Sequence, residues 1–147
     1  MIKDRKKLAV ALILLNLAFI WGNSMRTGNA SQETSEGIVD WFNIFLYLDE
    51  NSAALLHHLI RKAAHFAEFA CLGALIAWYF RLRGEKCPIV FPALLGMAAG
   101  LVDETIQLFT PDRGPSLIDV WLDASGALAG TLLLTLGQHL IKKKQNP

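Results

Sequence analysis

Polar and ionisable side chains stand inside three long apolar stretches of this chain, on one helical face and at the same end of each stretch. The three sets are Arg61, His65 and Glu68; Asp103, Glu104 and Gln107; and Asp119 with Asp123. A charge inside a membrane-length segment costs roughly 2.5–3.5 kcal/mol on insertion scales, so such groups are normally paired, solvated or functional. The three sets therefore predict one polar pocket that opens at one surface of a membrane.

The composition favours a small membrane protein. Hydrophobic residues make up 53% of the 147 residues and the mean hydropathy is +0.35, which is high for a chain that also carries 18% charged residues. Ten of the 14 Lys and Arg lie near residues 3–7, 81–86 and 142–144, as the positive-inside rule expects of three cytoplasmic segments. These clusters flank apolar stretches and lack interleaved aromatic residues, which argues against a nucleic-acid partner.

We expect an all-α integral membrane protein, a four-helix bundle that forms a single domain over residues 1–147. The predicted spans are residues 8–25, 62–80, 88–109 and 117–141, each near the ~20 residues that a bilayer requires. The positive-inside rule then places both termini in the cytoplasm.

Two segments near the N-terminus leave alternatives open. The first span is interpreted as a retained anchor rather than a cleaved signal peptide, because Trp21, Asn23 and Met25 stand where small residues would be expected. The aromatic-rich run at about 38–48 is too short to cross a bilayer. It predicts an additional interfacial or re-entrant segment.

Small residues predict how the helices pack. Two pairs of glycines share a face with an acidic residue of the last two spans: Gly96 and Gly100 with Asp103, and Gly126 and Gly130 with Asp123. Glycines at this spacing let helix backbones approach closely in lipid, so we expect these two glycine faces to touch each other and to diverge outward. The second span carries an alanine stripe opposite its charged face, and this stripe is expected to pack against another helix, such as the first span. The stripe consists of Ala63, Ala67, Ala70, Ala74 and Ala77.

The same residues resemble the motifs of VanZ-like membrane proteins. Residues 61–69, RKAAHFAEF, are similar to R-K-x-x-H-F-x-E-[YF], and residues 103–113, DETIQLFTPDR, are similar to D-E-x-x-Q-x-[FL]-x-P-x-R. Residues 119–130 resemble the closing D-x-x-x-N-x-x-G-x-x-x-G, except that Asp123 replaces the usual Asn. The resemblance covers roughly residues 55–135. It implies a multi-pass protein of the bacterial cytoplasmic membrane, linked to resistance to the glycopeptide teicoplanin, and it carries no catalytic assignment.

The basic side chains of the predicted pocket suit an anionic ligand. Arg61, Lys62 and Arg113 could hold a lipid headgroup, a lipid pyrophosphate or a peptide carboxylate, and the Arg fork suits such groups. The alternative is that these cations neutralise the neighbouring carboxylates and lock the bundle. The remaining candidates for ligand binding are Gln107, Asp119 and Asp123.

Acid–base chemistry is also possible at this pocket. The candidate residues are His65, Glu68, Asp103 and Glu104, and none has an assigned role. No metal site is expected, because the His65/Glu68 pair lacks the H-E-x-x-H pattern and the basic groups would repel a cation. No cofactor is expected either.

Three functional hypotheses follow from the sequence. The leading one is a VanZ-like membrane protein whose outward-facing polar pocket engages a cell-envelope lipid, an anionic envelope precursor or a glycopeptide-related ligand. The second is a membrane enzyme that modifies an envelope precursor by acid–base chemistry. The third is a proton-coupled carrier, since carboxylates inside a membrane suit proton relays.

Overall fold

The computed structural model describes residues 2–27, 36–41, 47 and 49–145. These residues form helices and their connections, without a strand. The long helices are α1 (Ile2–Ser24), α3 (Glu50–Arg83), α4 (Val90–Leu108) and α5 (Leu117–Gln145), and residues 36–41 are also helical. The all-α prediction is confirmed.

Three of the long helices could cross a membrane by length and composition: Lys3–Ser24, Glu50–Arg83 and Leu117–Ile141. Among the described helices α4, the third predicted span, falls short of this criterion. It has 19 residues, and its second half carries Asp103, Glu104 and Gln107. These three side chains are buried within the bundle, so α4 packs as a bundle helix with a polar half.

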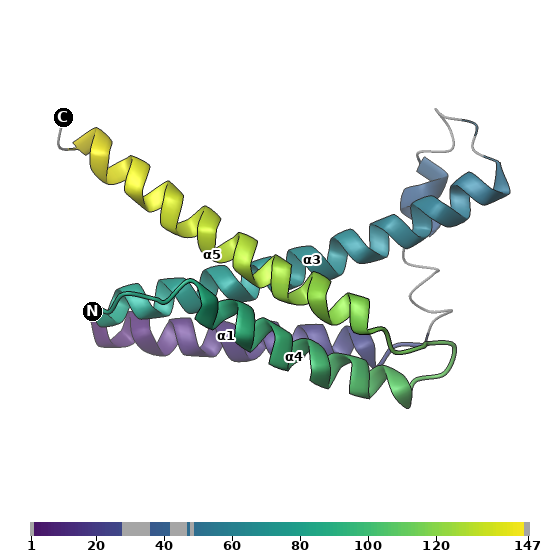
Figure 1. The fold of residues 1–147 in the computed structure, drawn as a ribbon, viewed down its shortest axis with the longest axis horizontal. Helices are drawn as coiled ribbons and strands as arrows, with labels where there is room; N and C mark the ends of the chain where they lie inside the picture. Colours follow the sequence, from purple (N-terminus) through teal and green to yellow (C-terminus); the bar gives the residue numbers. More distant parts are fainter. Residues whose placement is uncertain (1, 28–35, 42–46, 48, 146–147) are drawn as a thin grey trace.

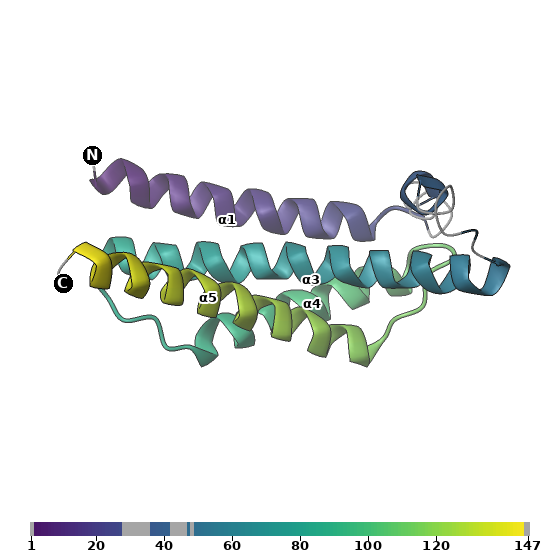
Figure 2. The ribbon, with the colours of Figure 1, turned by 90° about the horizontal axis from the view of Figure 1, so that it is seen from above.

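The helix ends separate into two groups. The start of α1, the end of α5 and the α3–α4 connection lie at one end of the bundle, whereas the end of α1 and the α4–α5 connection lie at the other (Figures 1 and 2). The basic segments near residues 3–7, 81–86 and 142–144 therefore share one end, which we call the basic end. The opposite end holds the α4–α5 loop, residues 109–116, and is called the loop end. The positive-inside rule requires the three basic segments to lie on the same side of the membrane, and this arrangement is consistent with that requirement.

Helix α3 is much longer than the span predicted at 62–80. It begins at Glu50, after the N-cap Asp49, whose side chain accepts a hydrogen bond from Ser52 N at 3.1 Å. Hydrogen bonds from Ser52 also lower the pKa of the Asp49 carboxyl. The helix ends at Gly84, which has a φ of 76°, a left-handed conformation that glycine adopts without strain. At 1.5 Å per residue its 34 residues extend about 51 Å, so the first turns project beyond the other helices (Figure 1).

The predicted interfacial segment at 38–48 is described only in part, because residues 42–46 and 48 lie outside the described residues. In its described part, Val39 is buried, whereas Ile38 and Trp41 are exposed. Ile38 also lines a cavity at the end of the bundle where α1 ends, and an exposed Trp in this segment suits the headgroup level of a bilayer.

The glycines of α4 and α5 do not face each other as predicted. The glycines of α4 face α5: a Cβ added at Gly96 would lie 2.6 Å from the Ala127 Cβ, and one at Gly100 would lie 2.7 Å from Asp123 Oδ2. The glycines of α5 instead face α3, where a Cβ added at Gly126 would lie 2.6 Å from the Phe66 carbonyl oxygen. Gly126 and Asp123 differ by about 60° around α5. The small-residue stripe of α5 is therefore wide enough to serve two neighbours.

The prediction for the alanine stripe of α3 is also wrong in part. Ala70 packs against Gly130 of α5, and Thr131 donates a hydrogen bond to Gly73 O across the same crossing, at 3.1 Å. Helix α1 packs on the other face of α3, where Ile20 joins the core cluster of Phe69, Leu72, Ile76 and Ala99. The small residues thus serve the closest crossing, between α3 and α5. The larger side chains of α1 fit the wider gap.

Candidate functional site

Two cavities lie at the loop end, and Arg61, His65 and Arg113 line both of them. The cavity of about 340 Å³ lies between α1 and α3, and we call it the α1 cavity. The cavity of about 430 Å³ lies between α3, α4, the loop and the start of α5, and we call it the α5 cavity. The other polar side chains of the α1 cavity are Asn23, Arg26 and Glu68. Those of the α5 cavity include Lys62, Glu104, Gln107 and Asp119.

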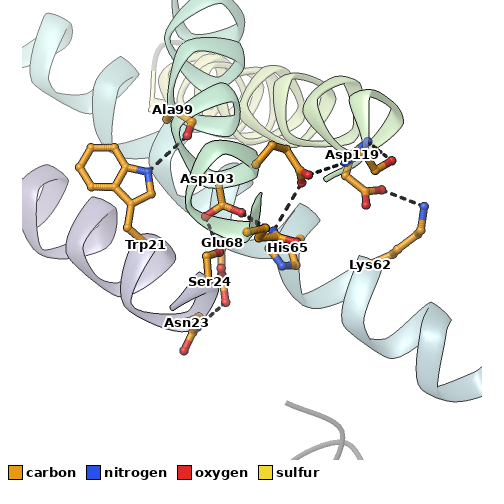
Figure 3. A network of polar contacts seen from close by, with 12 residues as sticks. Trp21, Asn23, Ser24, Lys62, His65, Glu68, Ala99, Asp103 and Asp119 are labelled. Atoms are coloured by element: carbon orange, nitrogen blue, oxygen red, sulfur yellow. Dashed lines mark hydrogen bonds and ion pairs between the residues drawn. The ribbon is translucent and has the colours of Figure 1, made fainter. Parts of the chain in front are cut away.

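Asp103 is the centre of a buried hydrogen-bond network between α1, α3 and α4 (Figure 3). The side chain is fully buried, and its two oxygens accept hydrogen bonds from Ser24 Oγ and from Gln107 Nε2, the second at 2.9 Å. His65 Nδ1 lies 4.0 Å from Asp103 Oδ2. Because both donors belong to buried side chains, the orientation of the Asp103 carboxylate is fixed from two sides.

Glu104 ties the loop end of α4 to the start of α5. Its carboxylate accepts hydrogen bonds from the backbone N–H of Ser116 and, at 3.4 Å, from Gln107 Nε2. Gln107 therefore donates to both acidic residues of α4. This bridging explains why a neutral amide stands between two carboxylates in the motif.

Lys62 and Asp119 close the outer side of the α5 cavity. Lys62 Nζ lies 2.8 Å from Asp119 Oδ1, and each side chain is 32% exposed. Ion pairs at this exposure contribute at most about 1 kcal/mol, so this pair orients the two side chains more than it stabilises the bundle.

The end of α1 supplies polar partners that sequence reasoning missed. Asn23 Nδ2 donates to Glu68 Oε1 at 2.9 Å, and Ser24 bonds to Asp103. One turn earlier, Trp21 Nε1 donates to Ala99 O at 3.3 Å (Figure 3). The signal was present: Asn23 and Ser24 stand at the loop-side end of the first span, at the depth of the charged sets on the other helices. Asn23 serves in the sequence analysis only as evidence against a cleavage site, and Ser24 is not used there.

Arg61 and Arg113, the two arginines that line both cavities and that we call the shared arginines, have few negatively charged partners. Among the described residues neither Arg61 nor Arg113 forms an ion pair, and the only hydrogen bond of Arg113 runs to Asn23 O at 3.4 Å. Arg113 Nε is buried without a hydrogen-bond partner in the described part of the chain. Burial lowers the pKa of the Arg113 guanidinium, and the positive charge of Arg61 lowers it further, while Asp103 opposes the shift. Two guanidinium groups thus face the same space with unused donors.

Asp123 lies apart from the cavities. Its side chain is 1% exposed and sits against Gly100 of α4, and it lines neither the α1 nor the α5 cavity. Both carboxyl oxygens lack a hydrogen-bond partner among the described residues. Asp123 lies at the depth along the bundle at which it was predicted to share a pocket with Glu68 and Asp103. Its side chain, however, points toward Gly100 of α4 and not into that pocket. A side chain that fills the space left by Gly100 cannot also reach the cavities.

The structure thus brings most of the predicted set together around the shared arginines. Arg61, His65 and Arg113 line both cavities, with Glu68 in one of them. Lys62, Glu104, Gln107 and Asp119 line the other cavity. Asp103 lies behind His65, and Asp123 lies between α4 and α5. No group of three or more His, Cys, Asp and Glu side chains suited to a metal ion occurs in the described part of the chain.

A helical bundle with three membrane-length helices and a polar site at one end defines a small multi-pass membrane protein. The chain belongs to the VanZ/LLP1 family, whose sequence model matches residues 8–138. This match confirms the resemblance seen in the motifs at 61–69 and 103–113 and extends it over α1. Comparison with curated proteins and with solved structures finds no match.

The position of Asp123 gives a prediction for the one departure from the family motif. Asp123→Asn should change the free energy of unfolding by less than about 1 kcal/mol, because Asn has the same shape and a buried charge without a partner would be costly. Thermal unfolding of the full-length protein in detergent measures this. Asp123→Leu is the contrast and should destabilise the protein, since branched methyl groups would press on Gly100. A loss above about 3 kcal/mol for the Asn variant would show that the negative charge is needed.

Proposed function

We propose that this protein acts in the bacterial cytoplasmic membrane in resistance to glycopeptides such as teicoplanin, by binding an anionic cell-envelope ligand at the loop end. The ligand is an envelope lipid, an anionic precursor or a glycopeptide-related group. Membership of the VanZ/LLP1 family supports the link to glycopeptides. The grouping of the basic segments at the other end supports an orientation with both termini cytoplasmic and the cavities outside.

The observation that carries the proposal is the pair of shared arginines. Arg61 and Arg113 line both cavities, and neither forms an ion pair with a described carboxylate. An anion between them would use their free donors and relieve their mutual repulsion. The guanidinium fork makes bidentate contacts to phosphate and carboxylate, so both the charge and the geometry suit such a ligand.

The alternative, in which the cations only neutralise the acids and lock the bundle, is supported for Lys62 but not for the arginines. Lys62 has a carboxylate partner, Asp119. Two buried acids of α4 take hydrogen bonds from neutral donors: Asp103 from Ser24 and Gln107, and Glu104 from Ser116 and Gln107. Glu68 accepts a hydrogen bond from Asn23 at one oxygen, and Asp123 faces α4 and lines neither cavity. None of these four described acids forms an ion pair with Arg61 or Arg113, which leaves the arginines available.

The proposal predicts that Arg61→Ala and Arg113→Ala each remove teicoplanin resistance from cells that depend on this protein, while the amount of protein in the membrane stays the same. Loss of one charged hydrogen-bond donor should weaken anion binding about 10-fold or more. Resistance is measured as the minimum inhibitory concentration, and abundance by immunoblot of membranes.

The control variant is Arg83→Ala. Arg83 is exposed at the basic end and pairs with Glu85 at 2.7 Å, far from both cavities. It should leave resistance unchanged. If both cavity variants disappear from the membrane, the arginines serve the fold, and the binding proposal fails.

A further inference from the structure

His65 lines both cavities together with Arg61 and Arg113, whereas the other histidine of the site, His58, lines the α5 cavity and not the α1 cavity. The His65 side chain is 22% exposed. Nδ1 is the ring nitrogen that faces Asp103 Oδ2, at 4.0 Å. The other ring nitrogen, Nε2, stands on the opposite edge of the imidazole, away from Asp103.

Asp103 has the features of a carboxylate that orients a histidine. It is fully buried, and Ser24 and Gln107 hold one oxygen each (Figure 3). At 4.0 Å no hydrogen bond joins the two groups, but the negative charge of this fixed carboxylate favours the tautomer in which Nδ1 carries the hydrogen and Nε2 is free to accept a proton. Asp103 is therefore a positioning residue, and the group that can meet a ligand is His65.

We propose that the protein hydrolyses the phosphoanhydride bond of a pyrophosphate held by Arg61 and Arg113, with His65 as the general base. The inference rests on the anion binding proposed above and deepens it. A pyrophosphate fits because it carries several negative charges, and Arg61 and Arg113 both line the α5 cavity. The third cation of this cavity, Lys62, pairs with Asp119, and the carboxylates of Glu104 and Asp112 also line it, so the two arginines are the groups that hold the anion. Cavities of about 340 and 430 Å³ on either side of the arginines leave space for a diphosphate group and a water molecule.

The proposed step needs only water as co-reactant. His65 Nε2 takes a proton from a water molecule while the water oxygen forms a bond to the terminal phosphorus. The bond from that phosphorus to the bridging oxygen breaks, and the bridging oxygen keeps the electron pair as part of the departing monophosphate. His65 then releases its proton to solvent. A phosphate leaving group needs no general acid, which fits a site whose described acids mostly accept hydrogen bonds.

Charged groups from several elements act on His65 and set the pH at which it loses its proton. Helix α1 faces the site with the neutral Asn23 and Ser24. The titratable groups around His65 are His58, Arg61, Lys62 and Glu68 of α3, Asp103 and Glu104 of α4, Asp112 and Arg113 of the loop, Asp119 of α5, and Arg26 just after α1. Removing the Asp103 charge should therefore move the rising limb of a pH–rate profile, which a purely structural residue would not do.

The test uses the full-length protein in lipid nanodiscs that contain farnesyl pyrophosphate, with released inorganic phosphate as the readout. We expect His65→Asn to lower the rate at least about 100-fold while binding of farnesyl pyrophosphate stays within about threefold. Asp103→Asn should lower the rate about 10-fold or more and shift the pH profile. His139→Asn is the matched control: His139 lies at the basic end, outside both cavities, and its replacement should leave the rate unchanged.

The outcomes separate this inference from the proposed function. Binding without phosphate release, or release that His65→Asn and His65→Gln leave unchanged, overturns the hydrolysis and leaves the anion site standing. Absence of binding overturns both. A second arm supplies inorganic pyrophosphate in solution. Hydrolysis of the lipid probe alone supports a lipid pyrophosphate as the substrate, whereas equal rates for the two probes overturn a membrane-borne source of the pyrophosphate.

Discussion

Replacing Gly130 with leucine should lower the free energy of unfolding by about 3 kcal/mol or more, the largest effect we expect from a single substitution. A Cβ at this position would overlap the backbone carbonyl of Ala70, so the clash cannot be relieved by rotating a side chain. The crossing of α3 and α5 also holds the hydrogen bond from Thr131 to Gly73 O. Since α3 carries the charged stripe and α5 carries Asp119, separating these helices should also disturb the α5 cavity. Thermal unfolding in detergent, followed by circular dichroism, measures the effect.

Gly137, on the same helix, is the matched control. A Cβ added at Gly137 meets no described atom within 4 Å, so Gly137→Leu should change the free energy of unfolding by no more than about 0.5 kcal/mol. Equal stability of the two leucine variants would contradict the close α3–α5 crossing. Gly130→Ala should fall between them, because it adds the overlapping Cβ and nothing more.

The comparison between sequence and structure is clearest at these glycines. Spacing of about 100° per residue correctly identifies which residues of α5 share a face, because that is a property of one helix. It does not identify the neighbour that the face meets. Gly126 and Gly130 lie against α3, and Asp123 of the same stripe lies against α4, while Ala127 contacts both Gly73 of α3 and Gly96 of α4. Which helix a given face packs against depends on the packing of all the helices together. The residue pattern of a single helix does not determine it.

The site was predictable to the extent that depth along a helix determines it. Glu68 of the second predicted span and Asp103 of the third stand at matching distances from the span ends. In the structure Glu68 lines the α1 cavity, and the Asp103 carboxylate lies 4.0 Å from His65 of the same cavity. The helix neighbour toward which a side chain points could not be predicted from depth alone. Asp123 lies at the right depth but points at Gly100, whose missing side chain leaves room for it. Asn23 was missed because the end of the first span was considered as an anchor and not as part of the pocket.

Asp103→Leu should be the second most damaging substitution, with a loss of about 2–3 kcal/mol in the free energy of unfolding. Leucine has the same number of side-chain heavy atoms but is bulkier, so steric pressure adds to the loss of polar contacts. The hydroxyl of Ser24 and the amide of Gln107 would be buried without their acceptor, and a buried donor left unsatisfied costs about 1–3 kcal/mol. The contact between His65 and this carboxylate would also be lost. Chemical denaturation of the full-length protein in detergent gives the measurement.

Asp119→Leu is the matched control, because it removes the same group from a different environment. Asp119 is 32% exposed and pairs with Lys62, so its loss should cost no more than about 1 kcal/mol. A double variant tests the mechanism further. Once Asp103 is leucine, Ser24→Ala removes an unsatisfied hydroxyl, so Ser24→Ala/Asp103→Leu should be more stable than the sum of the single losses predicts. Strict additivity would mean that Ser24 and Asp103 do not interact, and that α1 is held at the loop end by apolar packing alone.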